Sequence, residues 1–118
     1  MDQLNSTVTA ILEEWKITKP KLEELFRKRD QKSAKQFMEK GIFLFKQFLF
    51  ITNDLPVSIE QTIPYQQLTY KPVNLEERLE FIGSRPHLHH AYRQLAELMV
   101  ELEKMYVKKQ LQKNRPAK

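Results

Sequence analysis

The segment GIFLFKQFLFI, residues 41–51, holds eight large apolar side chains in eleven positions and decides the fold. It is too short to cross a bilayer, which takes about 20 apolar residues. Read backwards through SAKQFMEK, it continues a helical pattern from about Ser33 to Thr52, and Asn53 and Asp54 suit its end. Its apolar positions cover a broad arc, which is typical of a helix buried on most sides. We therefore predict a hydrophobic central helix.

Two phenylalanines depart from this pattern. Phe43 and Phe50 lie one heptad apart in the polar arc, beside Lys46. Leaving them in water would forgo burial worth roughly 1.5–3 kcal/mol for each ring. Two interpretations are open, a covering loop on a monomer or a contact with a second chain in a homodimer. We favour the loop and the monomer, because compact domains rarely leave such patches exposed.

Length and composition favour an all-α, single-domain bundle of about four to five helices over residues 1–118, with a tail that frays from about residue 114. Only two glycines occur, and the six prolines lie outside the strongest helical patterns. The absence of cysteine excludes disulfides, thiolate metal sites and a cysteine nucleophile. The N-terminus lacks the pattern of a signal peptide and no membrane span appears, so we expect a soluble, cytoplasmic protein.

The first third of the chain predicts two helices. The first begins near Asn5 or Ser6, and the sequence Thr18-Lys19-Pro20 should end it, because the residue before a proline avoids helical backbone angles. Pro20 then suits the first turn of a second helix. Asp30 either caps the central helix or lies inside a helix that continues from the second into the third.

Residues 53–73 form a connector that three prolines punctuate: Pro56, Pro64 and Pro72. Such a length without structure is unusual in a compact domain, and its apolar content predicts that it packs down. Short helical turns are expected at residues 58–61 and 65–69. We predict that the connector covers Phe43 and Phe50 through Ile59, Ile63 or Tyr65, with the stem of Lys46 along the seam.

Capping signals divide the rest of the chain into a short helix and a long one. Asn74 and Glu77 match a capping box, and Gly83 suits a left-handed helix end. Ser84 should cap the last helix, with Pro86 in its first turn. That helix is long and amphipathic, with one apolar stripe: Leu88, Ala91, Tyr92, Leu95, Leu98, Met99, Leu102 and Tyr106.

The net charge of +5 is unevenly distributed, with basic blocks at residues 16–46 and 104–118 around an acidic middle. The densest cluster forms a candidate basic patch: Arg27, Lys28, Arg29, Lys32 and Lys35. On a continuous helix, three of these lysines would line one face and could bind phosphate. An ordinary solvated face explains them as well, and the helix macrodipole explains the second block.

The most suggestive polar group gathers at the predicted start of the last helix: Ser84, Arg85, His87, His90 and Arg93. His87 and His90 lie about 60° apart on a helix and could share a ligand, whereas His89 points away. The group contains no carboxylate, so we expect no metal. Because a helix start attracts phosphate, an anion is the better candidate ligand, and a cap with a surface cluster is the plain alternative.

The segment NLEERLEFIGSRPHLHHAYRQLAEL, residues 74–98, resembles the YpoC-like family of small helical proteins from Bacillus-type bacteria. The resemblance covers about 25 residues, mainly ERLEFI and RPHLHHAYRQL. The family has no assigned activity, cofactor or catalytic residue, so the resemblance implies a bacterial cytosolic protein of unknown function.

No phosphate-binding loop, nucleophile elbow, zinc spacing or dinucleotide fingerprint occurs in the sequence. We therefore expect a non-enzymatic helical module that binds another protein, with no cofactor and no membrane contact. A nucleic-acid-binding protein that uses the basic patches is the alternative. An enzyme or an anion-binding site at the histidine cluster is the third possibility.

Overall fold

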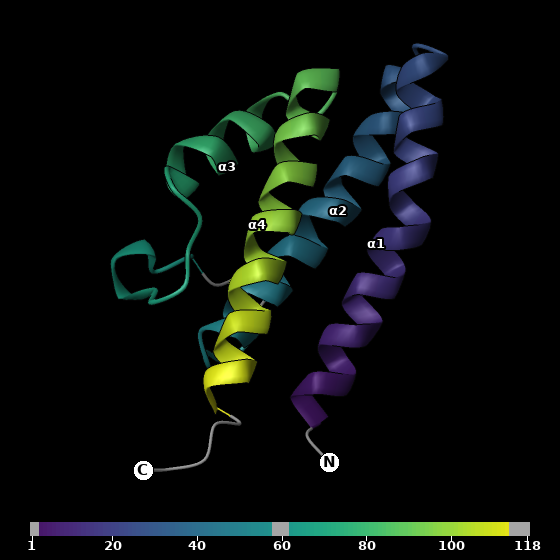
Figure 1. Cartoon of the computed structure of the whole chain (residues 1–118). Coiled ribbons are helices and arrows are strands. Elements are labelled where there is room, and N and C mark those ends of the chain that lie inside the picture. The colour runs from purple at the N-terminus through teal and green to yellow at the C-terminus, as the bar shows by residue number, and fades with distance from the viewer. Residues whose placement is uncertain (1–2, 58–61, 114–118) are drawn as a thin grey trace.

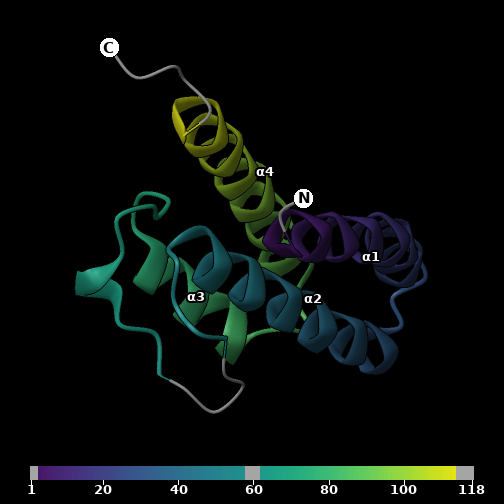
Figure 2. The same ribbon diagram turned by 90° about the horizontal axis from the view of Figure 1, so that it is seen from below.

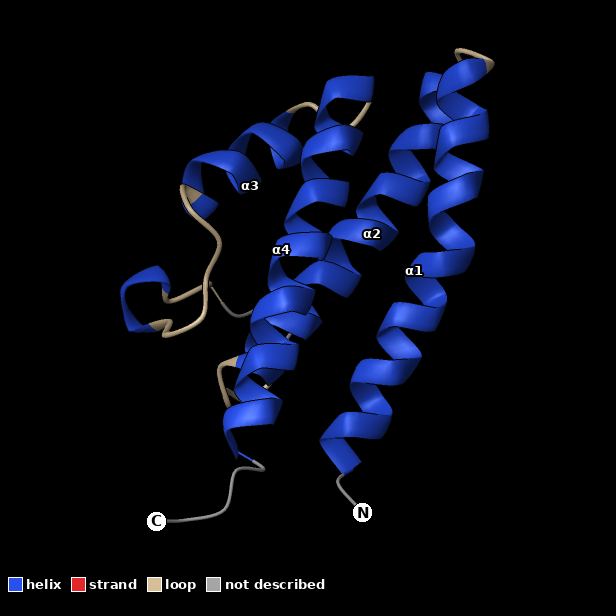
Figure 3. Cartoon of the chain, viewed as in Figure 1, coloured by secondary structure: helices blue, strands red, loops and turns tan. Residues whose placement is uncertain are grey.

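The computed structural model describes residues 3–57 and 62–113, and within these ranges the chain is helical without strands (Figure 3). It contains four α-helices and one short 3-10 helix: α1 (Gln3–Arg27), α2 (Gln31–Thr52), η1 (Tyr65–Gln67), α3 (Leu75–Ser84) and α4 (His89–Lys113). The predicted all-α bundle, with its hydrophobic central helix and long last helix, is confirmed.

Helix α2 lies at the centre of the bundle, packing against α1 on one side and α4 on the other, while α3 packs mainly on α4 (Figure 1). Figure 2 shows the C-terminal end of α4 pointing away from α1 and α2. Phe45 and Phe48 of α2 are completely buried, as are Leu95, Leu98 and Leu102 of α4. Phe37 of α2 is only half-buried, at the edge of this core.

The predicted break at Thr18-Lys19-Pro20 is wrong, because α1 continues through Pro20 to Arg27. Leu22 and Leu25 lie beyond the proline and are buried, so breaking the helix would lose their packing. The buried hydroxyl of Thr18 donates to the Glu14 carbonyl at 2.8 Å. Pro20 has no N–H group to donate to the carbonyl of Lys16, one turn before it. Both residues are exposed, so water can bind that carbonyl instead.

Asp30 separates α1 from α2, which settles the two interpretations of this turn. Its side chain accepts a hydrogen bond from the Ser33 N–H at 3.1 Å, as an N-cap residue does. Arg29 before it has a φ of 58°, a left-handed conformation in which no helix can continue. The basic residues of this region therefore do not line one continuous helix.

The connector is fastened to the end of α2 by Asn53. The Asn53 side-chain amide donates to the Tyr70 carbonyl and accepts from the Tyr70 N–H, both at 2.8 Å. Lys109 of α4 donates to the Thr52 carbonyl at 2.6 Å and to Asp54 at 2.7 Å, and it lies 5.3 Å from the Tyr70 ring. The predicted turn near Tyr65 is present as η1, whereas the turn predicted at residues 58–61 lies outside the described residues.

Phe43 and Phe50 have different surroundings. Phe50 is 2% exposed and belongs to the same buried cluster as Ile63 and Leu68 of the connector, as the covering loop requires. Phe43 is 37% exposed, so the cover predicted for it is wrong. Phe43 lies two helical turns before Phe50, about 10 Å from it along the axis, and the connector departs from the other end of α2. Lys46 between them is exposed, and Ile59 lies outside the described residues.

Of the boundaries predicted around α3, the start after Asn74 is correct and the end at Gly83 is wrong. Asn74 precedes α3 in a left-handed conformation and makes no side-chain cap hydrogen bond. Gly83 lies inside the helix without a positive φ, and Ser84 ends α3 rather than capping α4. The cause is Pro86, which keeps Arg85 before it out of the helical region and forces a turn before α4 begins at His89.

Candidate functional site

The residues of the candidate anion site lie around the turn between α3 and α4. The Arg85 guanidinium lies 5.6 Å above the Phe81 ring, and the His90 ring meets the same phenylalanine edge-on at 5.4 Å. His87 is exposed in the turn, so it does not share a helix with His90. Because Ser84 does not begin a helix, the free N–H groups expected there do not exist. Anion binding by this group stays a prediction.

His89 lies on the side of α4 that faces α1. Its ring is 5.4 Å from Phe26 and stacks on Tyr92 at 5.9 Å. The Tyr92 hydroxyl donates to the Glu23 carboxylate at 2.6 Å, which attaches the start of α4 to the last turns of α1. This hydrogen bond, helped by Lys19, lowers the pKa of Glu23, whereas burial and the carboxylate together raise the pKa of Tyr92. Within the described ranges, no group of three or more histidine, aspartate or glutamate side chains is arranged to hold a metal ion.

The basic patch occupies the turn between α1 and α2, and its members are all exposed: Arg27, Lys28, Arg29, Lys32 and Lys35. Lys28 pairs with Glu24 at 3.0 Å. Sequence reasoning treated this patch and the histidine cluster as separate. The contacts of Phe26 with His89 and Tyr92 bring them to the same end of the bundle (Figure 1).

Arg78 forms a polar contact between α3 and α4 that the sequence did not suggest. Its guanidinium binds both oxygens of Glu101, at 3.0 and 2.7 Å, while its Nε donates to Gln94 at 3.0 Å. The hydrogen bond with Glu101 raises the pKa of Arg78. Every one of these partners comes from α4, so Arg78 fixes how α3 lies on that helix.

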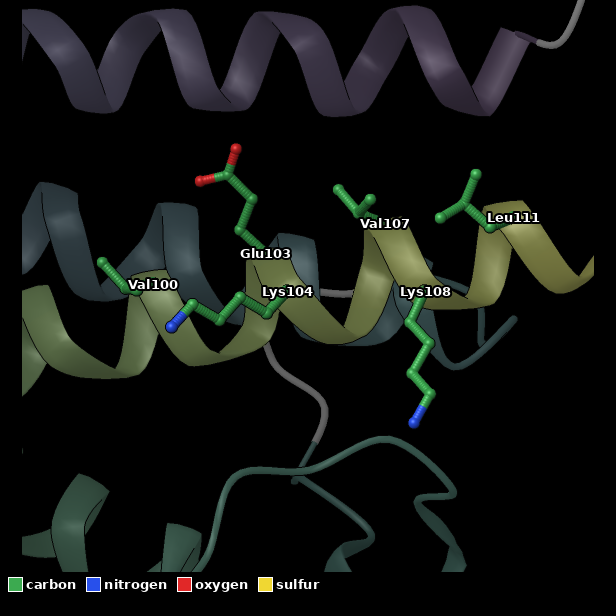
Figure 4. Close-up of a pocket in the computed structure, with 6 residues that line it drawn as sticks. All are labelled: Val100, Glu103, Lys104, Val107, Lys108 and Leu111. Carbon is green, nitrogen blue, oxygen red and sulfur yellow. The ribbon is translucent and has the colours of Figure 1, made fainter.

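The C-terminal half of α4 carries an exposed apolar face, shown in Figure 4. Val100 is 50% exposed, Val107 49% and Leu111 66%, although Leu98 and Leu102 on the opposite face are completely buried. Lys104 lies between them, and Glu103 and Lys108 flank them. We call Val100, Lys104, Val107 and Leu111 the outer stripe. Sequence reasoning missed it, because the buried stripe already accounted for an amphipathic helix.

The outer stripe borders the space between α4 and α1. In Figure 4 the side chains of Glu103, Val107 and Leu111 point toward α1, and Lys108 points toward the connector. Glu103 also lines a shallow hollow with Leu12 and Lys16 of α1. The exposed face is therefore continuous with the surface of α1.

The fold and these surfaces define a small helical-bundle protein with a basic patch at one end and an exposed apolar face on α4. The family model described as YpoC-like protein matches residues 5–114, so this chain belongs to the YpoC-like family. It is 32% identical over 103 residues to the uncharacterized protein YpoC of Bacillus subtilis (strain 168). That match covers 86% of this chain but only 63% of the relative, so the chain spans less than two thirds of the relative's length. No solved structure matches. Among the helices described, none has the length and apolar character needed to cross a membrane.

Proposed function

We propose that this protein is a helical interaction module that docks an amphipathic helix of a partner protein on the outer stripe of α4. The exposure of Val100, Val107 and Leu111 on one face of a single helix is the observation that carries this function. Apolar side chains that are exposed singly are ordinary on a protein surface. Three on one face, rimmed by charged residues, mark an interaction site instead.

The spacing of the outer stripe is that of a coiled-coil seam. Val100 and Val107 lie at d positions, and Lys104 and Leu111 lie at a positions, with intervals of four, three and four residues. In this register Glu103 falls at g and Lys108 at e, the positions whose charges select a partner and its orientation. A helix with its own apolar a and d residues therefore fits this face.

Charge favours another protein over a second copy of this chain as the occupant. In a parallel two-fold pair, Lys104 would face Lys104 across the seam, which offsets the gain from pairing Glu103 with Lys108 of the other copy. In an antiparallel pair, g positions face g positions and e positions face e positions, so Glu103 of one copy cannot pair with Lys108 of the other. A partner helix with a carboxylate opposite Lys104, and further acidic residues along the Lys108 side, avoids both conflicts.

Photocrosslinking tests this proposal with the full chain. A photoreactive amino acid at position 107 should crosslink in host extract to one protein, through a peptide with heptad-spaced apolar residues and an acidic residue between them. Leu111→Glu should abolish that crosslink. Ile17→Glu is the matched control, because Ile17 on α1 is also 66% exposed and should leave the crosslink unchanged.

Two results would contradict the proposal. A crosslinked peptide from this same chain would make the outer stripe a homodimer contact. A crosslink that survives Leu111→Glu would show that the stripe is not the docking face. We place this interaction in the cytoplasm, and fractionation of host cells tests that location.

A further inference from the structure

The turn between α1 and α2 and the turn between α3 and α4 lie at the same end of the bundle (Figure 1). Phe26 at the end of α1 lies 5.4 Å from His89 and 5.9 Å from Tyr92 at the start of α4, measured between ring centroids. Two basic segments, residues 27–35 and 85–93, therefore lie at the same end of the bundle although they are at least 50 positions apart in the sequence. We call six exposed cations of these segments the basic end: Arg27, Arg29, Lys32, Lys35, Arg85 and Arg93.

The acidic side chains near the basic end offset its charge only in part. Three carboxylates are held by hydrogen bonds within the protein: Glu23 from Tyr92 at 2.6 Å, Glu24 from Lys28 at 3.0 Å, and Asp30 from the Ser33 N–H at 3.1 Å. Within the described part of the chain, none of the six cations of the basic end forms an ion pair within 4 Å. Their charge is directed to solvent.

We infer that the basic end binds the phosphate backbone of duplex nucleic acid. The six cations lie in the two turns and in the helix ends next to them, and all are exposed, so they suit a ligand with phosphates repeated along its length. Contacts of this kind neutralise phosphates and carry no sequence information. Binding should therefore be independent of sequence.

The lack of exposed apolar anchors near the basic end favours nucleic acid over a protein or a membrane as its ligand. The large apolar side chains that are exposed in the described residues lie away from both turns: Ile17, Phe43, Val57, Val73, Val100, Val107 and Leu111. Protein interfaces depend on buried aromatic or apolar anchors, and peripheral membrane helices insert an apolar face. Two aromatic rings here, Phe26 and Tyr92, are engaged with His89. A third ring, Phe81, is engaged with Arg85 and His90, so few faces are left for stacking the bases of a single strand.

Fluorescence anisotropy with a labelled 20-base-pair DNA duplex tests the inference on the full chain. Between 50 and 200 mM salt, the logarithm of the binding constant should fall with a slope of about −4, as four or five phosphate contacts give. Arg29→Glu with Lys32→Glu should reduce that slope by about two, and Arg85→Glu with Arg93→Glu should do the same. The control pair, Lys16→Glu with Lys46→Glu, makes the same charge change on exposed lysines away from both turns.

Each other outcome contradicts the inference. An equal loss of DNA affinity in the control pair would mean that net charge alone attracts DNA. A loss of affinity in only one of the two test pairs would show that the two turns do not act as one surface. Stronger binding to a single strand of the same length, or binding only to vesicles that contain phosphatidylserine, would assign a different ligand, and no binding at 50 mM salt would remove the site. Melting temperatures confirm that the variants fold. If the variant with both Arg85→Glu and Arg93→Glu does not fold, Arg93→Glu alone is used in its place.

Discussion

Gly41 lies where α2 meets both of its long neighbours, and alanine at this position should destabilise the protein. A Cβ atom there would stand 2.9 Å from Cδ2 of Leu95 on α4 and 3.0 Å from Cζ3 of Trp15 on α1. Gly83, the other glycine, is also helical, but a Cβ there would meet no atom within 4 Å. Comparing alanine at the two positions separates the effect of helix propensity on stability, which both share, from the effect of packing, which applies only at Gly41.

Both substitutions should raise the free energy of unfolding by about 0.5–1 kcal/mol through helix propensity, because alanine loses less backbone entropy on folding than glycine does. At Gly83 nothing opposes this gain, so Gly83→Ala should be stabilising. At Gly41 the added methyl group overpacks a core in which Leu95 is completely buried, and overpacking typically costs about 1–3 kcal/mol. Gly41→Ala should therefore be less stable than Gly83→Ala by about 1–3 kcal/mol.

Equilibrium unfolding in urea, followed by circular dichroism, measures the difference between the two variants. The dependence on denaturant should be equal for both, so that a shift in midpoint reports stability alone. If Gly41→Ala is stabilised as much as Gly83→Ala, α2 does not approach α1 and α4 as closely as the structure shows.

Three further predictions use the same measurement of stability. Phe50→Ala should cost about 3–5 kcal/mol and Phe43→Ala less than about 1 kcal/mol, and equal costs would contradict the burial of only one ring. The pKa of Glu23 is lower in the folded protein than its ordinary 4.5. Ionised Glu23 therefore stabilises the folded state fully above pH 4.5, and this stabilisation is lost as the pH falls through the pKa of Glu23 in the folded protein. The stability advantage of the wild type over Tyr92→Phe should therefore shrink below about pH 4.5, and a constant difference would mean that Tyr92 does not hold the carboxylate. Zinc or nickel should not raise the melting temperature, and a saturable rise lost in His87→Ala and His90→Ala would reveal a metal site.

The central helix could be predicted because its signal is local. Eight large apolar side chains in eleven residues require most of the segment 41–51 to be buried, and Asp30 lies where it can cap the helix that contains this segment. The same rules failed at Pro20. There the apolar face of α1 continues past the proline through Leu22 and Leu25, and burial outweighs the lost hydrogen bond.

The surfaces could not be predicted because they depend on contacts between distant residues. Arg29 and Arg93 lie 64 positions apart, and the packing of Phe26 against His89 and Tyr92 shows that they share one end of the bundle. Each basic segment by itself looks like an ordinary solvated face. Their combined charge is a property of the folded chain.

Lys109 explains why α4 leaves three apolar residues in water. From its apolar pattern alone, the end of α4 could turn Val100, Val107 and Leu111 inward, since Lys109 lies about 180° from them on the helix. However, α2 ends at the buried Thr52, whose carbonyl has no partner within its helix. Lys109 supplies that partner at 2.6 Å and pairs with Asp54 at 2.7 Å, while Tyr106 packs against Phe48 at 5.6 Å. These contacts act together with the burial of Leu98 and Leu102 to set the rotation of α4, so the outer stripe faces outward.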